Sequence, residues 1–197
     1  MGRLLFWLLA AILLGAGTHL ATVLFSPAVS MASVMSRFHA AAPLNRMTVL
    51  GPEILGTVLR EPNPDIVYAV CPYDLQAGDL LIDASIPEFY WALSIYSNRG
   101  DNVYTLNDQQ AGVSRLRFRL QLEKPAFDLQ EVITGDEDAE EAAEVQIQTK
   151  DDTVLVKTPT ADGLVMLRAF LPDQAYRARV TEQLAASSCA TAGPPAP

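Results

Sequence analysis

Residues 89–96 read FYWALSIY and residues 115–122 read RLRFRLQL, and these two stretches decide the fold. In the first, large apolar side chains alternate with smaller or more polar ones: Phe89, Trp91, Leu93 and Ile95 against Tyr90, Ala92, Ser94 and Tyr96. In the second, four apolar residues alternate with three arginines and a glutamine: Leu116, Phe118, Leu120 and Leu122 against Arg115, Arg117, Arg119 and Gln121. A period of two is typical of a β-strand with one buried and one solvated face.

Shorter stretches of the same kind surround these two. Further strands are predicted at residues 66–71, 80–84, 103–106, 145–149, 153–157 and 164–170, separated by turn sequences such as Ala77-Gly78-Asp79 and Ala161-Asp162-Gly163. Short strands joined by short turns favour a mainly β fold, an antiparallel β-sandwich or a jelly-roll-like sheet. A C-terminal helix is predicted to begin at Leu171-Pro172-Asp173, with Tyr176, Val180 and Leu184 forming a stripe that lies on the sheet.

The N-terminus carries a different signal. Residues 4–25, LLFWLLAAILLGAGTHLATVLF, contain no charge, and a helix of that length spans about 33 Å, enough to cross a bilayer core. Arg3 precedes the run and the next basic residue is Arg37, so the positive-inside rule predicts a cytoplasmic N-terminus and a periplasmic C-terminal domain, anchored once in the inner membrane. The alternative is a cleaved signal peptide with a processing site near Ser30-Met31-Ala32.

The chain divides accordingly into four parts. We expect a transmembrane anchor at residues 1–26, a juxtamembrane neck and linker at 27–59, an exported β domain at 60–188 and a flexible tail at 189–197. The neck carries a helical pattern, ended by Pro43, that packs on the domain or membrane surface or, alternatively, dimerises; its apolar positions are Met31, Val34, Met35 and Phe38.

Composition excludes several functions. The net charge is −9 with a pI of about 4.6, which argues against nucleic-acid binding through a broad basic face. The acidic run from Asp136 to Glu144 lacks the alternating ligands of a calcium loop and is interpreted as a solvated loop. Arg115, Arg117 and Arg119 face one side and could hold that loop or an anion, or simply form surface ion pairs.

The chain has two cysteines and two histidines. In an exported domain, Cys71 and Cys189 are expected to form a disulfide, with two separate thiols as the alternative. No nucleophile-elbow, zincin or Walker motif is present in the sequence, and both histidines precede the strands. We therefore expect no catalytic residue, no metal site and no cofactor.

Residues 60–108 resemble a bacterial family catalogued as domain of unknown function 1254. Asn63, Asp65 and Tyr68 match its N-x-D-x-x-Y segment, the pair Asp74-Leu75 its D-L element, and the pair Tyr90-Trp91 its aromatic pair. The resemblance implies that longer relatives carry a second domain, numbered 1214, and that this chain is a short, membrane-anchored version whose companion domain belongs to a separate protein. No activity follows, because that family is itself uncharacterised.

Two hypotheses about function remain open. The first is a membrane-anchored interaction module of the cell envelope, whose partner is a separate envelope protein. The second is a small-ligand-binding domain or an uncharacterised enzyme that uses a face of aromatic and carboxylate side chains. The candidate ligand-binding residues, for which core or rim packing is the alternative role, are Asp65, Tyr68, Asp74, Tyr90, Trp91, Tyr96 and Asp108.

Overall fold

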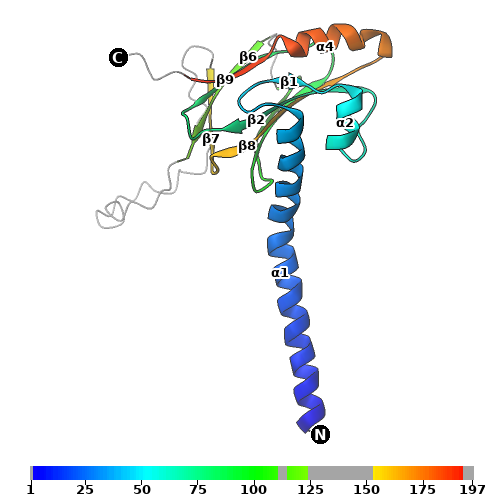
Figure 1. The fold of residues 1–197 in the computed structure, drawn as a ribbon, viewed down its shortest axis with the longest axis vertical. Helices are drawn as coiled ribbons and strands as arrows, with labels where there is room; N and C mark the ends of the chain where they lie inside the picture. Colours follow the sequence, from blue (N-terminus) through cyan, green and yellow to red (C-terminus); the bar gives the residue numbers. More distant parts are fainter. Residues whose placement is uncertain (1, 111–114, 124–152, 193–197) are drawn as a thin grey trace, which may run out of the picture.

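The computed structural model describes residues 2–110, 115–123 and 153–192. One long helix, α1 (Gly2–Ala41), projects from a β domain, and the N-terminus lies at its far end (Figure 1). The strand predicted at 145–149 and the acidic run from Asp136 to Glu144 lie outside the described residues.

Helix α1 is long and apolar enough to cross a membrane, and its most apolar stretch is not buried against the domain. The residues expected to form the anchor and those expected to begin the neck lie in one continuous helix that includes Pro27, and a division at residue 26 stays a prediction. Proline has a φ that fits a helix although it lacks an N–H donor, and α1 continues through Pro27. The C-terminal end of α1 is held by Met35 and Phe38, which are buried in the domain.

Nine strands of the described residues form two sheets. The first sheet has the order β1 (Thr48–Val49), β2 (Ile66–Asp74), β8 (Asp162–Phe170), β4 (Trp91–Ser97) and β5 (Asn102–Asn107), and all its pairs are antiparallel. The second has the order β7 (Thr153–Thr158), β6 (Arg115–Leu122), β3 (Leu80–Ser85) and β9 (Ser188–Thr191), with β6 and β7 parallel. The predicted mainly β fold is therefore confirmed, with one mixed sheet.

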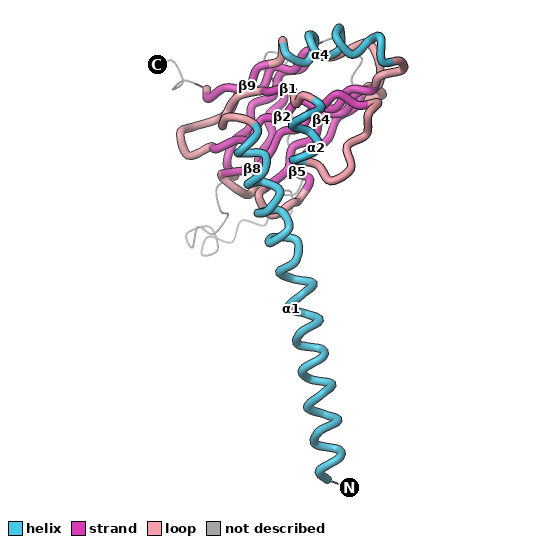
Figure 2. Tube along the Cα trace, turned by 45° about the vertical axis from the view of Figure 1, so that its right-hand side comes forward, coloured by secondary structure: helices cyan, strands magenta, loops and turns pink. Residues whose placement is uncertain are grey.

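Two helical elements flank the sheets. Helix α2 (Pro52–Val58), which the sequence analysis did not predict, packs beside the end of α1 (Figure 2). The C-terminal helix starts where predicted: the Asp173 carboxylate accepts a hydrogen bond from the Ala175 N–H (2.7 Å) and caps a 3₁₀ turn, η2 (Gln174–Tyr176), that leads into α4 (Arg177–Ala185). Val180 and Leu184 are buried, whereas Tyr176 remains 39% exposed.

The main core lies between the sheets. Strand β6 shows the predicted alternation, and its buried residues Leu116, Phe118 and Leu120 face the core. In β4, however, Ala92 and Ser94 of the expected solvated face are also buried. They are covered because Arg168 of β8 and Thr105 of β5 reach over Ser94 and hydrogen-bond its hydroxyl (3.2 and 3.1 Å).

A second core lies on the outer face of the five-stranded sheet. There the end of α1 and α2 cover that sheet with a cluster whose buried members are Met35, Phe38, Ala42, Leu50, Leu55, Val58, Tyr68, Val70 and Leu164. All seven inner residues of β2 are consequently buried, on both faces of the strand. The helix is therefore fixed to the domain by apolar packing, and no flexible linker separates them.

A disulfide joins Cys71 of β2 to Cys189 of β9, with 6.5 Å between their Cα atoms, and so connects the two sheets. The flexible tail was expected to begin at residue 189, but residues 188–191 pair with β3, opposite residues 80–83. This correction has a simple cause: the cystine holds Cys189 at the sheet, where its neighbours complete a short edge strand. Strand β1 was not predicted either.

Tyr73 is fully buried between the sheets, and its hydroxyl contacts the Tyr96 carbonyl and the Thr158 hydroxyl, each at 3.1 Å. Gly163 lies directly against the Tyr73 hydroxyl, and a Cβ at residue 163 would overlap with both that hydroxyl and the Tyr96 carbonyl. Burial raises the pKa of Tyr73, and the hydrogen bond with Thr158 offsets only part of that rise.

We expect Cys189→Ser to lower the free energy of unfolding by about 2–4 kcal/mol, because the bridge closes a long loop, without abolishing the fold. Thermal unfolding measures this. Reductant should lower the melting temperature of the wild type and leave that of the variant unchanged. Detection of two reactive thiols in the native oxidised protein would contradict the bridge.

Tyr73→Phe should cost about 1–2 kcal/mol at pH 7, since it removes a hydroxyl with two buried partners. Because the folded-state pKa of Tyr73 is raised, its contribution to stability is complete below about pH 10 and is lost as the pH rises through the folded-state value. The difference in stability between the wild type and Tyr73→Phe should therefore narrow above pH 10. Urea unfolding between pH 7 and 11 tests this, with Tyr90→Phe, an exposed position, as the control.

Candidate functional site

The outer face of the four-stranded sheet forms a groove of about 820 Å³. The register pairs Leu81 with Arg119 and Asp83 with Arg117, so side chains of neighbouring strands stand in rows on this face. The residues that line the groove are Leu81, Ile82, Asp83, Arg117, Phe118, Arg119, Gln121, Thr153, Leu155, Ser188 and Ala190. This groove is a candidate binding surface because of its size and its mixture of apolar and polar groups.

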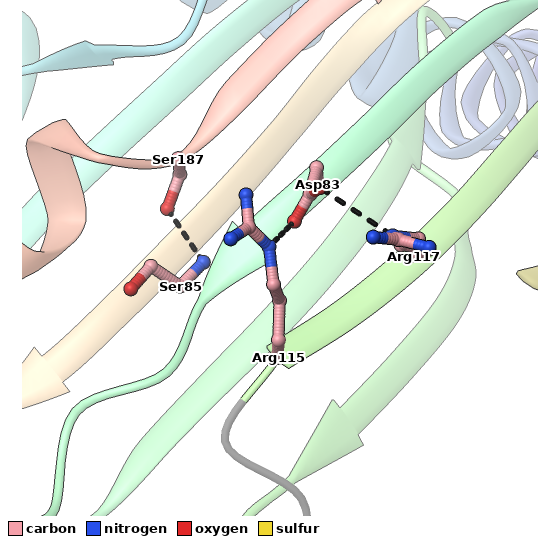
Figure 3. A network of polar contacts seen from close by, with 5 residues as sticks. All are labelled: Asp83, Ser85, Arg115, Arg117 and Ser187. Atoms are coloured by element: carbon pink, nitrogen blue, oxygen red, sulfur yellow. Dashed lines mark hydrogen bonds and ion pairs between the residues drawn. The ribbon is translucent and has the colours of Figure 1, made fainter. Parts of the chain in front are cut away.

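Asp83 lies between two arginines of β6 (Figure 3). One carboxylate oxygen accepts a hydrogen bond from Arg115 Nε, and the other lies 3.5 Å from Arg117 Nε. The Asp83 carboxylate raises the pKa of Arg115. Beside them, Ser187 Oγ accepts the Ser85 N–H (2.9 Å) and so ties the end of β3 to the residue before β9.

A second carboxylate continues the charged row. Asp79 accepts hydrogen bonds from Arg119 Nη1 (3.3 Å) and from the Gln121 side-chain amide. The arginines of β6 therefore form ion pairs with Asp83 of β3 and with Asp79 immediately before β3, which is the surface-pairing alternative of the sequence analysis. This face carries three guanidinium groups and two carboxylates. The two carboxylates are partly exposed, so solvent screens these ion pairs.

The predicted aromatic residues do not form one patch. Tyr68 is buried and Tyr96 half-buried in the cluster beneath α1 and α2, and Trp91 is buried in the core between the sheets. Tyr90 is 53% exposed, at the start of β4. The structure thus brings Tyr68 and Tyr96 into one packed cluster and leaves Tyr90 at the surface.

Two of the predicted carboxylates make structural hydrogen bonds, one to local backbone and one to a distant side chain. Asp74 Oδ1 accepts the Gln76 N–H (2.8 Å), as expected of a turn cap, and Asp65 Oδ1 accepts a hydrogen bond from Gln174 Nε2 (3.0 Å). Asn63 Oδ1 accepts the Asp65 N–H (2.9 Å) at the start of β2. Asp108 is the exception, since its Oδ1 is buried without a hydrogen-bond partner. A role for these residues in ligand binding stays a prediction.

Sequence reasoning missed Asp79, Asp83 and Arg168 as members of a site. The first two lie more than 30 residues before the arginines in sequence, with β4 and β5 between, so only the β3–β6 pairing brings them together. Arg168 carried a signal, because it is the one charged residue within the apolar stretch 164–170. Among the described residues, no group of three or more His, Cys, Asp or Glu side chains lies close enough to hold a metal ion.

A family model described as a protein of unknown function (DUF1254) matches residues 44–189. The chain belongs to this family. The matched region starts after α1 ends at Ala41 and stops at Cys189, so the family domain comprises α2, both sheets and α4, and the apolar helix precedes it. The family begins earlier than the predicted domain start at residue 60, because β1 and α2 belong to the folded unit.

The fold is similar to that of the VPA0106 protein from Vibrio parahaemolyticus, with a TM-score of 0.55 and 12% sequence identity over 83% of this chain and 35% of that one. A putative uncharacterised protein from Burkholderia cenocepacia is less similar, with a TM-score of 0.41 and 11% identity over 65% of this chain and 32% of that one. The chain thus spans about a third of the length of each of these proteins. No curated protein matches its sequence.

Asp83→Asn should lower the free energy of unfolding by less than about 1 kcal/mol, because Arg115 and Arg117 are largely solvated on the face where they meet Asp83. Urea unfolding at low and high salt measures the effect, which added salt should reduce. Glu88→Gln, which removes the exposed Arg179 pair, is the matched control. A loss of several kcal/mol would show that Asp83 is needed to build the sheet.

Proposed function

We propose that this protein is a membrane-anchored, extracytoplasmic interaction module of the bacterial cell envelope. The observation that carries the proposal is the continuity of α1, whose first part is exposed and apolar while Met35 and Phe38 near its end are buried in the β domain. Because the anchor helix packs directly into the β domain, it would hold that domain in a fixed orientation relative to other proteins of the same membrane.

Two features support an extracytoplasmic domain. Arg3 is the only basic side chain before the apolar run, and Arg37 is the next one along the chain, which favours a cytoplasmic N-terminus. The Cys71–Cys189 disulfide is the kind of bond that persists in an oxidising compartment such as the periplasm.

The proposed partner is a separate envelope protein. The VPA0106 protein extends far beyond the third of its length that this chain matches, so proteins of this fold occur together with additional structure in one chain. We propose that here a second protein supplies such a companion domain, and that the β domain binds it above the membrane.

A second candidate function is binding of a small polar ligand in the groove of the four-stranded sheet. Two properties of the groove support this function: its volume, and the hydrogen-bonding groups of Asp83, Arg117 and Gln121 that line it. Titration of the full chain in detergent with N-acetylglucosamine, followed by amide NMR, tests this candidate. Saturable shifts confined to groove residues such as Leu81 and Ala190 would support it, and their absence would count against this sugar class.

Pull-down from detergent-solubilised membranes at native expression tests the interaction. One envelope protein should be recovered in a fixed ratio to this chain, and Phe38→Ala, which loosens the domain from its anchor, should reduce the yield. Recovery of the chain alone would count heavily against an interaction module.

Topology provides the independent test. Protease added to spheroplasts should digest the β domain or release it, because everything after Pro27 is expected outside the cytoplasmic membrane. A cytoplasmic protein serves as the control for membrane integrity. Complete protection of the β domain in intact spheroplasts would overturn the proposed orientation.

A further inference from the structure

One corner of the outer face of the five-stranded sheet is not covered by α1 and α2. The strand register places Arg168 beside Tyr68 on one side and beside Ala92 on the other, with Asn107 next in the row. In the row beyond, the Phe170 N–H donates to the Tyr90 carbonyl (2.8 Å), which continues the β4–β8 ladder by one residue. We name this surface the Arg168 corner and define it as Arg168, Tyr90, Phe170 and Asn107.

The aromatic side chains of the corner are exposed. Tyr90 is 53% and Phe170 41% exposed, although both lie on a sheet whose other outward side chains, such as Tyr68 and Val70, are buried beneath helices. Neighbouring exposed aromatic rings on an otherwise covered face are typical of a contact surface for another macromolecule.

Arg168 itself carries a charge that nothing in the described residues compensates. Its Nη2 donates to the neutral Ser94 hydroxyl (3.2 Å), its Nε is buried without a partner, and no described carboxylate lies within 4 Å of its guanidinium. Arg115, Arg117 and Arg119 of the other sheet all have an aspartate. Partial burial removes water from the Arg168 guanidinium, and one neutral hydrogen bond does not replace that hydration.

The position of the corner leaves it accessible. The opposite end of β8 begins at Asp162, which accepts a hydrogen bond from Asn98 in the β4–β5 turn (2.8 Å). Gly100 of that turn lies against Met31 of α1, the part of the helix nearest the apolar run. Phe170 and Tyr90 therefore lie at the end of the sheet farther from the membrane, where a neighbouring protein can reach them.

We propose that the Arg168 corner binds an acidic segment of the partner protein. A carboxylate of the segment receives N–H donors of the Arg168 guanidinium, which lies on the Ser94 side of Arg168. An apolar side chain farther along the segment packs on Tyr90 and Phe170, in the row on the other side of Arg168. A bidentate Arg–carboxylate pair combined with exposed aromatic residues on the same face is a composition typical of interface hot spots. This inference rests on the proposed function and adds the chemistry of the partner to it.

The test uses the full chain in lipid nanodiscs and a phage-displayed library of peptides about 12 residues long. Selected peptides should carry Asp or Glu between apolar residues. Replacing that acid by Asn or Gln in the synthetic peptide, or Arg168→Met in the protein, should weaken binding by about 30-fold or more, which is usual for breaking a desolvated charge pair. Tyr90→Ser should weaken it as well.

Arg99→Met, an exposed arginine at the other end of the sheet, is the matched control and should leave binding unchanged. Arg168→Met should fold with an unchanged or higher melting temperature, because it removes an uncompensated charge and keeps an apolar stem. If it does not fold, Tyr90→Ser and the peptide variants still decide the question.

Three results would overturn the inference: selected peptides without acidic residues, equal binding by the wild type and Arg168→Met, or competition by sodium acetate as strong as by the peptide, which would indicate a site for small carboxylates. The pull-down separates this inference from the proposed function. A partner recovered equally well with Arg168→Met rejects the corner alone, whereas recovery of no partner with the wild type rejects the interaction module.

Discussion

Burial of both faces of β2 is the constraint on which the rest of the structure depends. Its inward residues Val67, Ala69 and Tyr73 pack against the second sheet, while Tyr68 and Val70 on the other face pack beneath α1 and α2. A strand buried on both faces needs three layers, so the helix that carries the apolar run is a structural part of the domain. Detaching α1 would expose the outer cluster to water, which is why the tether and the β domain form one unit.

The sequence predicted the fold where the signal was local. Strand β6 was predictable because its outward face meets solvent and its alternation is strict, and the start of the C-terminal helix because Asp173 caps it. Strands β1 and β9 were not predictable, since two and four residues carry no periodicity and each exists through its partner strand. Ala92 and Ser94 were assigned to the wrong environment because the side chains that cover them come from other strands.

The candidate site was less predictable than the fold, because it depends on contacts between residues that are far apart in sequence. The alternation identified Tyr90 and Tyr96 as outward residues, and Tyr68 was a further candidate. Whether an outward tyrosine is exposed depends, however, on a helix that ends at residue 41. Only Tyr90, beyond the reach of α1 and α2, stays at the surface. The row of arginines in β6 is visible in the sequence, whereas its aspartate partners lie more than 30 residues away, Asp83 in β3 and Asp79 immediately before it. Arg168 is isolated among apolar residues in the sequence, and only the fold reveals that no carboxylate of the described residues forms an ion pair with it.

The two sheets differ in how the arginine side chains on their outer faces are paired. On the four-stranded sheet each arginine of β6 lies near an aspartate and stays largely hydrated. These arginines therefore lose little hydration free energy on folding, and the aspartates offset the positive potential that a partner would meet. On the five-stranded sheet Arg168 is partly buried, and no carboxylate of residues 2–110, 115–123 or 153–192 forms an ion pair with it. Because the guanidinium has already lost part of its hydration, an incoming carboxylate has less desolvation to bring about when it binds. The proposed membrane anchoring would strengthen this effect, because two proteins confined to one bilayer meet at a high effective concentration. A single charged and aromatic corner can then hold a partner that would bind too weakly if both proteins were free in solution.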